Sequence, residues 1–166
     1  MRECVIVDID GTLSNPEHRL SLIENDRPDW DAFHDLCYLD EPYPDIIELV
    51  TEFANQYDII ICTDRNESNR RETNEWLNEH NVPCENMYMR TSGDDSTEIV
   101  LKEEMLDTVQ SEYSVRLVIE DSEKCVEMYR NAGHHLDVLQ IHADEMQQNW
   151  NFWKTLDSNK NLTNED

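Results

Sequence analysis

The chain has 166 residues, a length typical of one domain that buries a core without disulfides or a structural metal. Its 38 acidic and 13 basic residues give a formal net charge of −25, which disfavours nonspecific binding to nucleic acid or to an anionic membrane. A polyanionic substrate would have to be met by a few focused cationic side chains and a metal ion. The same acidity is typical of proteins from saline cytoplasm, and the sequence leaves open whether the host is halophilic.

Five short segments rich in Val and Ile are predicted as strands, at 4–9, 58–63, 86–90, 115–120 and 136–141. They are apolar almost continuously, a pattern typical of strands that are covered on both faces of a parallel sheet. Helical periodicity fills most of the intervals, at 44–56, 67–80, 96–109 and 122–133. This alternation predicts a doubly wound, Rossmann-like α/β fold with a mainly parallel five-stranded sheet and right-handed crossovers.

The predicted domain spans residues 1–156, and its one irregular part is residues 14–43. This stretch is rich in proline and aromatic residues, and we expect a small cap-like insert of loops and short helix after the first strand. Residues 157–166 lack apolar periodicity and are predicted to form a disordered acidic tail. For the segment "MQQNWNFW" the pattern fits a short helix or a strand, and the two stay open.

The five cysteines are scattered and form no C-x-x-C pair, which indicates buried thiols in a reducing cytosol and argues against a zinc site. The N-terminus enters a predicted strand at once, and no apolar run approaches the roughly 20 residues of a membrane helix. We therefore expect a cytoplasmic protein without membrane contact. The oligomeric state is left open.

Polar and charged side chains gather where the predicted strands end. In a doubly wound sheet these carboxyl ends meet at one edge, where ligands bind. The strand ends and the helix before the fourth strand contribute Asp8, Asp10, Thr12, Thr63, Arg65, Arg90, Asp94, Lys102, Glu120 and Asp121. Clustered carboxylates of this kind suit Mg²⁺, which prefers oxygen ligands.

The spacing of Asp8 and Asp10 is suited to phosphoryl transfer. An aspartate held beside Mg²⁺ can attack phosphorus in line, which gives an aspartyl-phosphate that water then hydrolyses. The carboxylate two residues further on points to the same side of an extended chain, so it can protonate the leaving oxygen and later deprotonate the water. Lys102 and the arginines would offset the remaining charge of a phosphate.

The stretch "DIDGT" resembles motif I of the haloacid dehalogenase (HAD) superfamily of phosphotransferases. Thr63 fits motif II, Lys102 motif III, and Glu120-Asp121 the acidic motif IV, in the order of that superfamily. The resemblance implies that Asp8 is the nucleophile and Asp10 the general acid/base.

By the same resemblance, Thr63 and Lys102 hold the phosphoryl group, and Thr12 belongs to the substrate site. The implied cofactor is Mg²⁺, bound by Asp8, the backbone carbonyl of Asp10 and an acidic residue of motif IV. Asp121 is the preferred residue of the last pair, with Glu120 as the alternative ligand.

A narrower resemblance runs from residue 4 to about residue 141. The stretches "DIDGTLSNPEHRL", "WDAFHDLC", "EWLNEHNVP" and "VIEDSEKCVEMYRNAG" are similar to the 3′-phosphatase domain of phage-type polynucleotide kinase and to short stand-alone proteins with that domain. This similarity implies removal of 3′-phosphate from DNA or RNA ends in nucleic acid repair. It places Arg19, Arg65 and Asp94 at the phosphatase site, with the two arginines touching the substrate phosphate. Arg90 is assigned to the substrate site because it ends the third predicted strand. No G-x-x-x-x-G-K-[ST] loop is present, so kinase activity is not expected.

Three departures from the family pattern stand out. Asp64 replaces the glycine of the usual T-G-R or S-G-R, and Glu120 replaces the first aspartate of the usual D-D. The stretch after Asp94 lacks the basic residue that is common there. Two alternatives therefore stay beside the end-processing phosphatase: a phosphatase of small substrates such as nucleotides, and a catalytically inactive binding module on the same fold.

Overall fold

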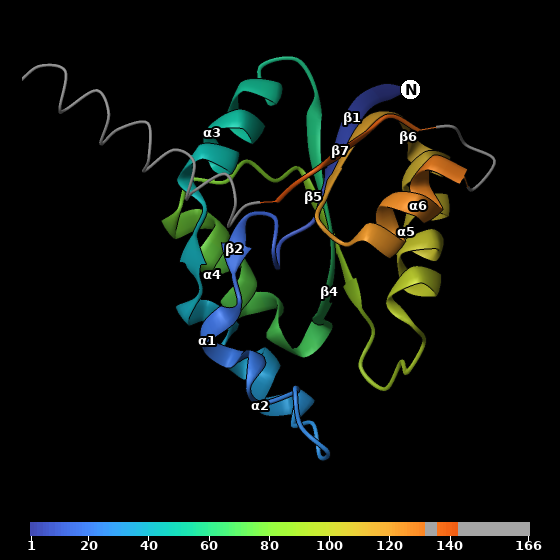
Figure 1. Cartoon of the computed structure of the whole chain (residues 1–166). Helices are drawn as coiled ribbons and strands as arrows, with labels where there is room; N and C mark the ends of the chain where they lie inside the picture. Colours follow the sequence, from blue (N-terminus) through green and yellow to red (C-terminus); the bar gives the residue numbers. More distant parts are fainter. Residues whose placement is uncertain (132–135, 143–166) are drawn as a thin grey trace, which may run out of the picture.

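The computed structural model describes residues 1–131 and 136–142 (Figure 1). The predicted tail 157–166, the segment "MQQNWNFW" and the predicted end of the domain at residue 156 lie outside these residues. Among the described residues, no helix combines the length and the apolar composition needed to cross a membrane.

The main sheet has five strands, all parallel, in the order β5-β4-β1-β6-β7. The strands are β1 (Arg2–Val7), β4 (Asp58–Asn66), β5 (Asn86–Arg90), β6 (Tyr113–Glu120) and β7 (Val138–Gln140). The chain leaves β1 toward one edge and returns to pair β6 on its other side. This reversal beside β1 is the place where doubly wound sheets open a crevice for ligands. The predicted fold class is confirmed.

Two helices cover each face of the sheet. On one face lie α3 (Pro44–Phe53) and α4 (Arg70–Glu79), the latter preceded by the short η2 (Glu67–Asn69), and on the other face lie α5 (Glu98–Glu112) and α6 (Glu123–Asn131) (Figure 1). Helix α5 begins after Thr97, whose hydroxyl accepts a hydrogen bond from the Val100 amide. The four helices predicted from periodicity are thus present, with ends that differ by a few residues.

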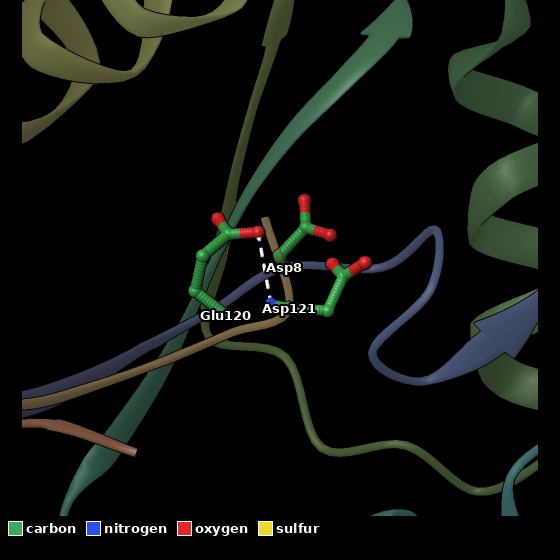
Figure 2. A group of neighbouring side chains, drawn as sticks. All are labelled: Asp8, Glu120 and Asp121. Atoms are coloured by element: carbon green, nitrogen blue, oxygen red, sulfur yellow. Dashed lines mark hydrogen bonds between the residues drawn. The ribbon is translucent and has the colours of Figure 1, made fainter. Parts of the chain in front are cut away.

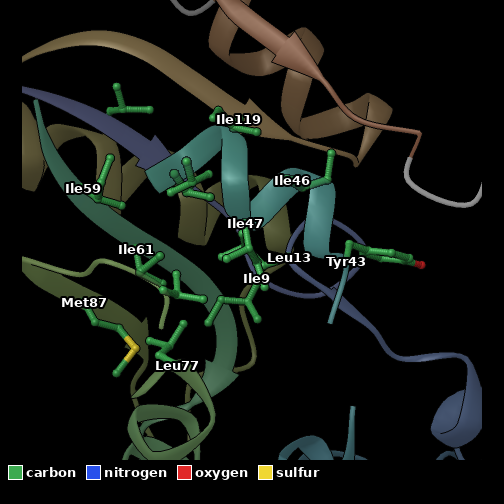
Figure 3. Close-up of a cluster of buried hydrophobic side chains, with 14 of the residues drawn as sticks. Ile9, Leu13, Tyr43, Ile46, Ile47, Ile59, Ile61, Leu77, Met87 and Ile119 are labelled. Carbon is green, nitrogen blue, oxygen red and sulfur yellow. The ribbon is translucent and has the colours of Figure 1, made fainter. Parts of the chain in front are cut away.

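The alternation of strand side chains divides the core into two layers. Val5 and Val7 of β1 pack with α3 and α4, in the cluster that Figure 3 shows around Ile47, whereas Cys4 and Ile6 face α5 and α6. Both faces of β1 are therefore apolar and buried. A strand covered in this way holds its carboxyl end rigidly, and Asp8 follows it directly.

The insert between β1 and α3 contains short elements. These are β2 (Ser14–Asn15), α1 (Glu17–Leu20), α2 (Trp30–Asp35), η1 (Cys37–Leu39) and β3 (Glu41–Pro42). The strands β2 and β3 pair antiparallel and close the base of the insert. Helices α1 and α2 lie at the end of the sheet opposite the start of β1, so the insert stands at the carboxyl ends of the strands (Figure 1).

All five cysteines are free thiols in the described residues, and four of them are buried. Cys84 is the exposed one. Burial raises the pKa of the Cys4, Cys62 and Cys125 thiols to about 12, so these three are inert packing groups at neutral pH. The expectation of buried thiols is met at four of the five positions.

Candidate active site

Three carboxylates converge at the carboxyl ends of β1 and β6. Asp8, Glu120 and Asp121 each offer an oxygen, and these atoms lie within 4.8 Å of one another (Figure 2). Asp8 and Glu120 are buried and Asp121 is half-buried. The two strands are neighbours in the sheet, and the Asp8 amide donates to the Ile119 carbonyl at 3.0 Å. This backbone contact fixes the spacing of the two acidic segments.

Lys102 of α5 reaches into this cluster with a fully buried side chain. Its Nζ atom donates to Asp8 Oδ1 at 2.5 Å, to Glu120 Oε2 at 3.1 Å and to the Cys62 carbonyl at 2.8 Å. Three acceptors surround the ammonium group, so its position is set by β1, β4 and β6 together. The structure therefore brings the predicted residues of three motifs into contact.

The charges in this cluster do not balance, and the pKa directions show it. Desolvation and the neighbouring Glu120 raise the pKa of Asp8 well above its usual value, although Lys102 works against them. Desolvation and Glu120 also raise the pKa of Asp121 to about 7. Three carboxylates against one ammonium group leave negative charge uncompensated. A negatively charged site with oxygen ligands of this kind fits a hard divalent cation such as Mg²⁺.

Asp10 belongs to a second cluster, next to the first. Its Oδ1 atom accepts hydrogen bonds from Arg19 Nη2 at 2.6 Å, from Arg65 Nη2 at 2.7 Å and from the Ser14 hydroxyl at 3.1 Å. Desolvation alone would raise the pKa of Asp10, but Arg65 and Arg19 outweigh it and hold this pKa well below its usual range. The Asp10 carboxylate is thus ionised and directed at the arginines.

Asp40 completes the second cluster, and sequence reasoning missed it. Its buried carboxylate accepts from Arg19 through Nε at 2.7 Å and Nη2 at 2.6 Å, and from Arg65 Nη2 at 2.8 Å. The Ser14 hydroxyl and a ring nitrogen of His18 also contact it. Two guanidinium groups therefore face two carboxylates, and this pairing makes the burial of four charges tolerable.

Arg19 and Arg65 were expected to touch a substrate phosphate. Both side chains are fully buried, and their contacts go to Asp10 and Asp40. In this arrangement they orient Asp10. One donor, Arg65 Nη1, is buried without a hydrogen-bond partner among the described residues.

Thr12 and Thr63 lie beside the carboxylates, and both are fully buried. The Thr12 hydroxyl donates to Asp121 Oδ1 at 3.0 Å, so it orients a predicted metal ligand. The Thr63 hydroxyl oxygen accepts from the Arg65 amide at 3.2 Å. Thr63 follows Cys62, whose carbonyl binds Lys102, and this places the threonine at the edge of the first cluster.

Gly11 is required by this geometry. Its φ is +88°, and a Cβ atom on it would lie 2.2 Å from Asp121 Oδ2. We expect Gly11→Ala to lower the phosphatase activity that the resemblance implies at least tenfold, by about the cost of an ångström-scale misplacement, and to destabilise the fold. Gly93→Ala is the matched control, because its φ is +85° and nothing lies within 4 Å of the added Cβ.

The control variant measures the backbone cost alone, roughly 1–2 kcal/mol for a side chain in the left-handed region. Urea unfolding and initial-rate assays of the two variants separate this cost from the clash with Asp121. Equal losses of activity in both variants would contradict the role given to the contact between Gly11 and Asp121.

Arg90 and Asp94 lie apart from both clusters. The Arg90 guanidinium pairs with Asp64, with Nε 2.6 Å from Asp64 Oδ1, and its Nη1 donates to the carbonyls of Asp94 and Ser96. Asp94 Oδ1 accepts from the Ser96 amide at 2.8 Å, a local turn contact. These two residues shape the loop before α5, and the structure does not bring them to the carboxylates.

Asp64 replaces a family glycine without a special backbone conformation. It lies inside β4, and Asn81 is the one non-glycine residue with positive φ among those described. The acidic charge that Asp64 adds near the site is compensated by Arg90, since the two groups form an ion pair. The exchange from glycine to aspartate is thus matched by a partner on β5.

Two hollows open beside the clusters. One has a volume of about 620 Å³ and is lined by Asp10, Gly11 and Asp121 together with residues of α1 and the end of the sheet. The other has a volume of about 550 Å³ and lies between α2, the end of β4 and the loop before α5. The short insert leaves both of them open to solvent.

The order of the parallel strands, with helices on both faces of the sheet, defines a HAD-like α/β fold. A haloacid dehalogenase-like family hydrolase, SP0104 from Streptococcus pneumoniae, aligns with a TM-score of 0.56 at 15% identity, over 90% of this chain and 98% of that one. A family model described as the polynucleotide kinase PNKP phosphatase domain matches residues 2–146, and the chain belongs to this family. It is a HAD-type phosphatase.

Two further solved structures share the fold. A chain of the Pnkp1/Rnl/Hen1 complex aligns with a TM-score of 0.69, and a chain of the Pnkp1/Rnl/Hen1 RNA repair complex with 0.71, each at 22% identity over 85% of this chain. The alignments cover 46% and 42% of those chains, so the present chain spans less than half of their length. A search of curated proteins finds no significant match.

Proposed function

We propose that the protein is a Mg²⁺-dependent phosphomonoesterase that works through an aspartyl-phosphate and removes 3′-phosphate from nucleic-acid ends. The observation that carries the proposal is the convergence of Asp8, Glu120 and Asp121 around a buried lysine in a chain of the polynucleotide kinase phosphatase family. When bound, the cation would neutralise the carboxylates and the substrate phosphate.

Each residue of the first cluster has a place in this reaction. Asp8 is the nucleophile at phosphorus, and Lys102, together with Thr63, holds the phosphoryl oxygens. Glu120 already uses Oε1 for the amides of Asp121 and Ser122 and Oε2 for Lys102. Because these contacts occupy Glu120, Asp121 is the preferred metal ligand of motif IV, with the backbone carbonyl of Asp10 beside it.

Asp10 is the general acid/base of the proposal. The arginine contacts hold its carboxylate ionised, and this state suits removal of a proton from the attacking water. Protonation of the leaving oxygen requires that Asp10 first gain a proton.

The choice of a polynucleotide end over a small substrate has two supports. The chain belongs to the family of polynucleotide kinase phosphatase domains, and related folds occur in an RNA repair complex. The insert consists of elements of two to six residues, so it does not fold into a separate lid over the hollows. A polymer end can therefore approach the carboxyl edge of the sheet.

The test compares a 3′-phosphorylated oligonucleotide with a 3′-mononucleotide under identical conditions. After treatment with EDTA, added Mg²⁺ should restore phosphate release, and the oligonucleotide should react faster than the mononucleotide. The assay is run at low and high salt because the net charge of −25 repels a polyanion at low ionic strength. Equal rates on both substrates would contradict the end-processing role and favour small phosphoesters.

A further inference from the structure

The hollow between α2, the end of β4 and the loop before α5 has an aromatic wall. Trp30 is 51% exposed, although tryptophan is a residue that folding usually covers. Its ring stacks with the His34 ring at a centroid distance of 6.3 Å and an interplanar angle of 29°. Both residues line the hollow, so a flat apolar surface faces an open volume of about 550 Å³.

The Trp30 ring is held in place by buried side chains that pack against it. The buried ring of Phe33 meets Trp30 edge to face, with centroids 5.8 Å apart. The Arg19 guanidinium carbon lies 4.1 Å from the centre of the Phe33 ring, and Arg19 also binds Asp10. The position of Trp30 is therefore tied through two side chains to the proposed acid/base.

The opposite side of the hollow borders the phosphoryl site. Asp64, which lines the hollow, follows Thr63 directly. Glu98, which also lines it, lies one helical turn before Lys102 on α5, and its carboxylate accepts from the Ser122 hydroxyl next to Asp121. Two residues of the lining are therefore neighbours, in the chain or on the helix, of the residues proposed to hold the phosphoryl group.

The charges around the hollow select the kind of ligand. Five carboxylates line it, against the single guanidinium of Arg90, which is already bound to Asp64, Asp94 and Ser96. Such a lining repels a second phosphate group. It accepts an uncharged aromatic ring whose amino groups donate hydrogen bonds, as those of nucleobases do.

We propose that the hollow binds the 3′-terminal nucleobase of the substrate, stacked on Trp30, while the 3′-phosphate lies at Asp8. This inference rests on the proposed function and deepens it, because it names a subsite for the end nucleoside. Base-on-aromatic stacking tolerates every base, so Trp30 gives affinity for a nucleoside end without sequence preference.

The test uses two 3′-phosphorylated oligonucleotides, one with a normal terminal nucleotide and one with an abasic terminal residue. The wild-type enzyme should show a kcat/KM for the normal substrate at least about fivefold above that for the abasic one, the lower end of what stacking contributes. Trp30→Ala should remove this preference, so that its kcat/KM becomes the same for the normal and the abasic substrate. Trp30→Phe should keep most of it.

Tyr38→Ala is the matched control, because Tyr38 is a 50% exposed aromatic residue of the same insert that does not line this hollow. Trp30→Ala should lose more activity on the normal substrate than on the abasic one or on acetyl phosphate, which has no base, whereas Tyr38→Ala should lose activity on none of the three. A wild-type enzyme that does not distinguish the base from the abasic end overturns the stacking subsite but leaves the 3′-phosphatase intact. Equal losses by Trp30→Ala on all three substrates would overturn it as well, and a wild type inert on both oligonucleotides overturns both proposals.

Discussion

Replacing Asp8 with asparagine should lower the rate of phosphate release from a 3′-phosphorylated oligonucleotide by at least about 10⁴-fold, the scale at which loss of a nucleophile acts. The amide keeps the size of the side chain and can still accept from Lys102, but it cannot attack phosphorus. Because Asp8 is a buried carboxylate with a raised pKa, its neutralisation should not destabilise the fold. Initial rates and urea unfolding of the same preparation measure both effects.

The control for this variant is Asp26→Asn, which makes the same chemical change at an exposed aspartate of the insert. It should keep wild-type activity and stability. Residual activity of Asp8→Asn above a few per cent would mean that another group attacks phosphorus, and the assignment of motif I would have to be abandoned.

Replacing Lys102 with methionine should reduce the free energy of unfolding by about 3–5 kcal/mol, the usual result of removing one partner from a buried ion pair. Without the ammonium group, Asp8 and Glu120 lie buried beside each other with no cation in the cluster. Lys124→Met on the exposed side of α6 is the control and should change stability by less than about 0.5 kcal/mol.

The stability of the Lys102→Met variant should also depend on pH. Asp8, which loses its contact with Lys102, has a raised pKa in the folded state, so its protonated form is favoured there. The stability lost by Lys102→Met should therefore be small at pH 5 and grow as the pH rises toward 8. Urea unfolding at both pH values measures it. A loss of less than about 1 kcal/mol at pH 8 would show that the lysine does not compensate the cluster.

The site residues that can be predicted from the sequence are those that directly follow a strand. Continuous apolar runs identify β1, β4 and β6, and a parallel sheet brings their carboxyl ends together. The residues that follow these runs therefore become neighbours, as Asp8 and Asp121 do. Lys102 could be placed in addition because it is the first lysine of the chain and lies on a helix between two of these strands.

The part that sequence did not reveal lies in the insert. Asp40 lies between η1 and β3 in a segment with no apolar period, and its partners Arg19 and Arg65 are 21 and 25 residues away. No local pattern predicts such a contact, since it depends on how the insert folds back over the strand ends. The arginines were recognised by resemblance, but the carboxylate that shares them was not.

Asp64 is a second residue whose partner cannot be found from the local sequence. In the sequence it is a departure from the family pattern, and its partner Arg90 lies 26 residues further along the chain. Pairing of β4 with β5 brings Arg90 to it, and the register of the two strands shifts between Cys62 and Asn66 to do so. A substitution in one strand is thus explained by a residue of the neighbouring strand.

The buried ion pairs of Asp40 and Arg19 restrict movement of the insert relative to the rest of the domain. The insert is joined to the strand ends by the Arg19–Asp10 and Arg65–Asp40 ion pairs, and to α4 by the Trp76 indole, which donates to the Asp40 carbonyl at 2.8 Å. Hinge motion of the insert would pull Arg19 from Asp10, the proposed acid/base. We therefore expect the insert to stay in place during the reaction, with substrate and product exchanging through the hollows beside it.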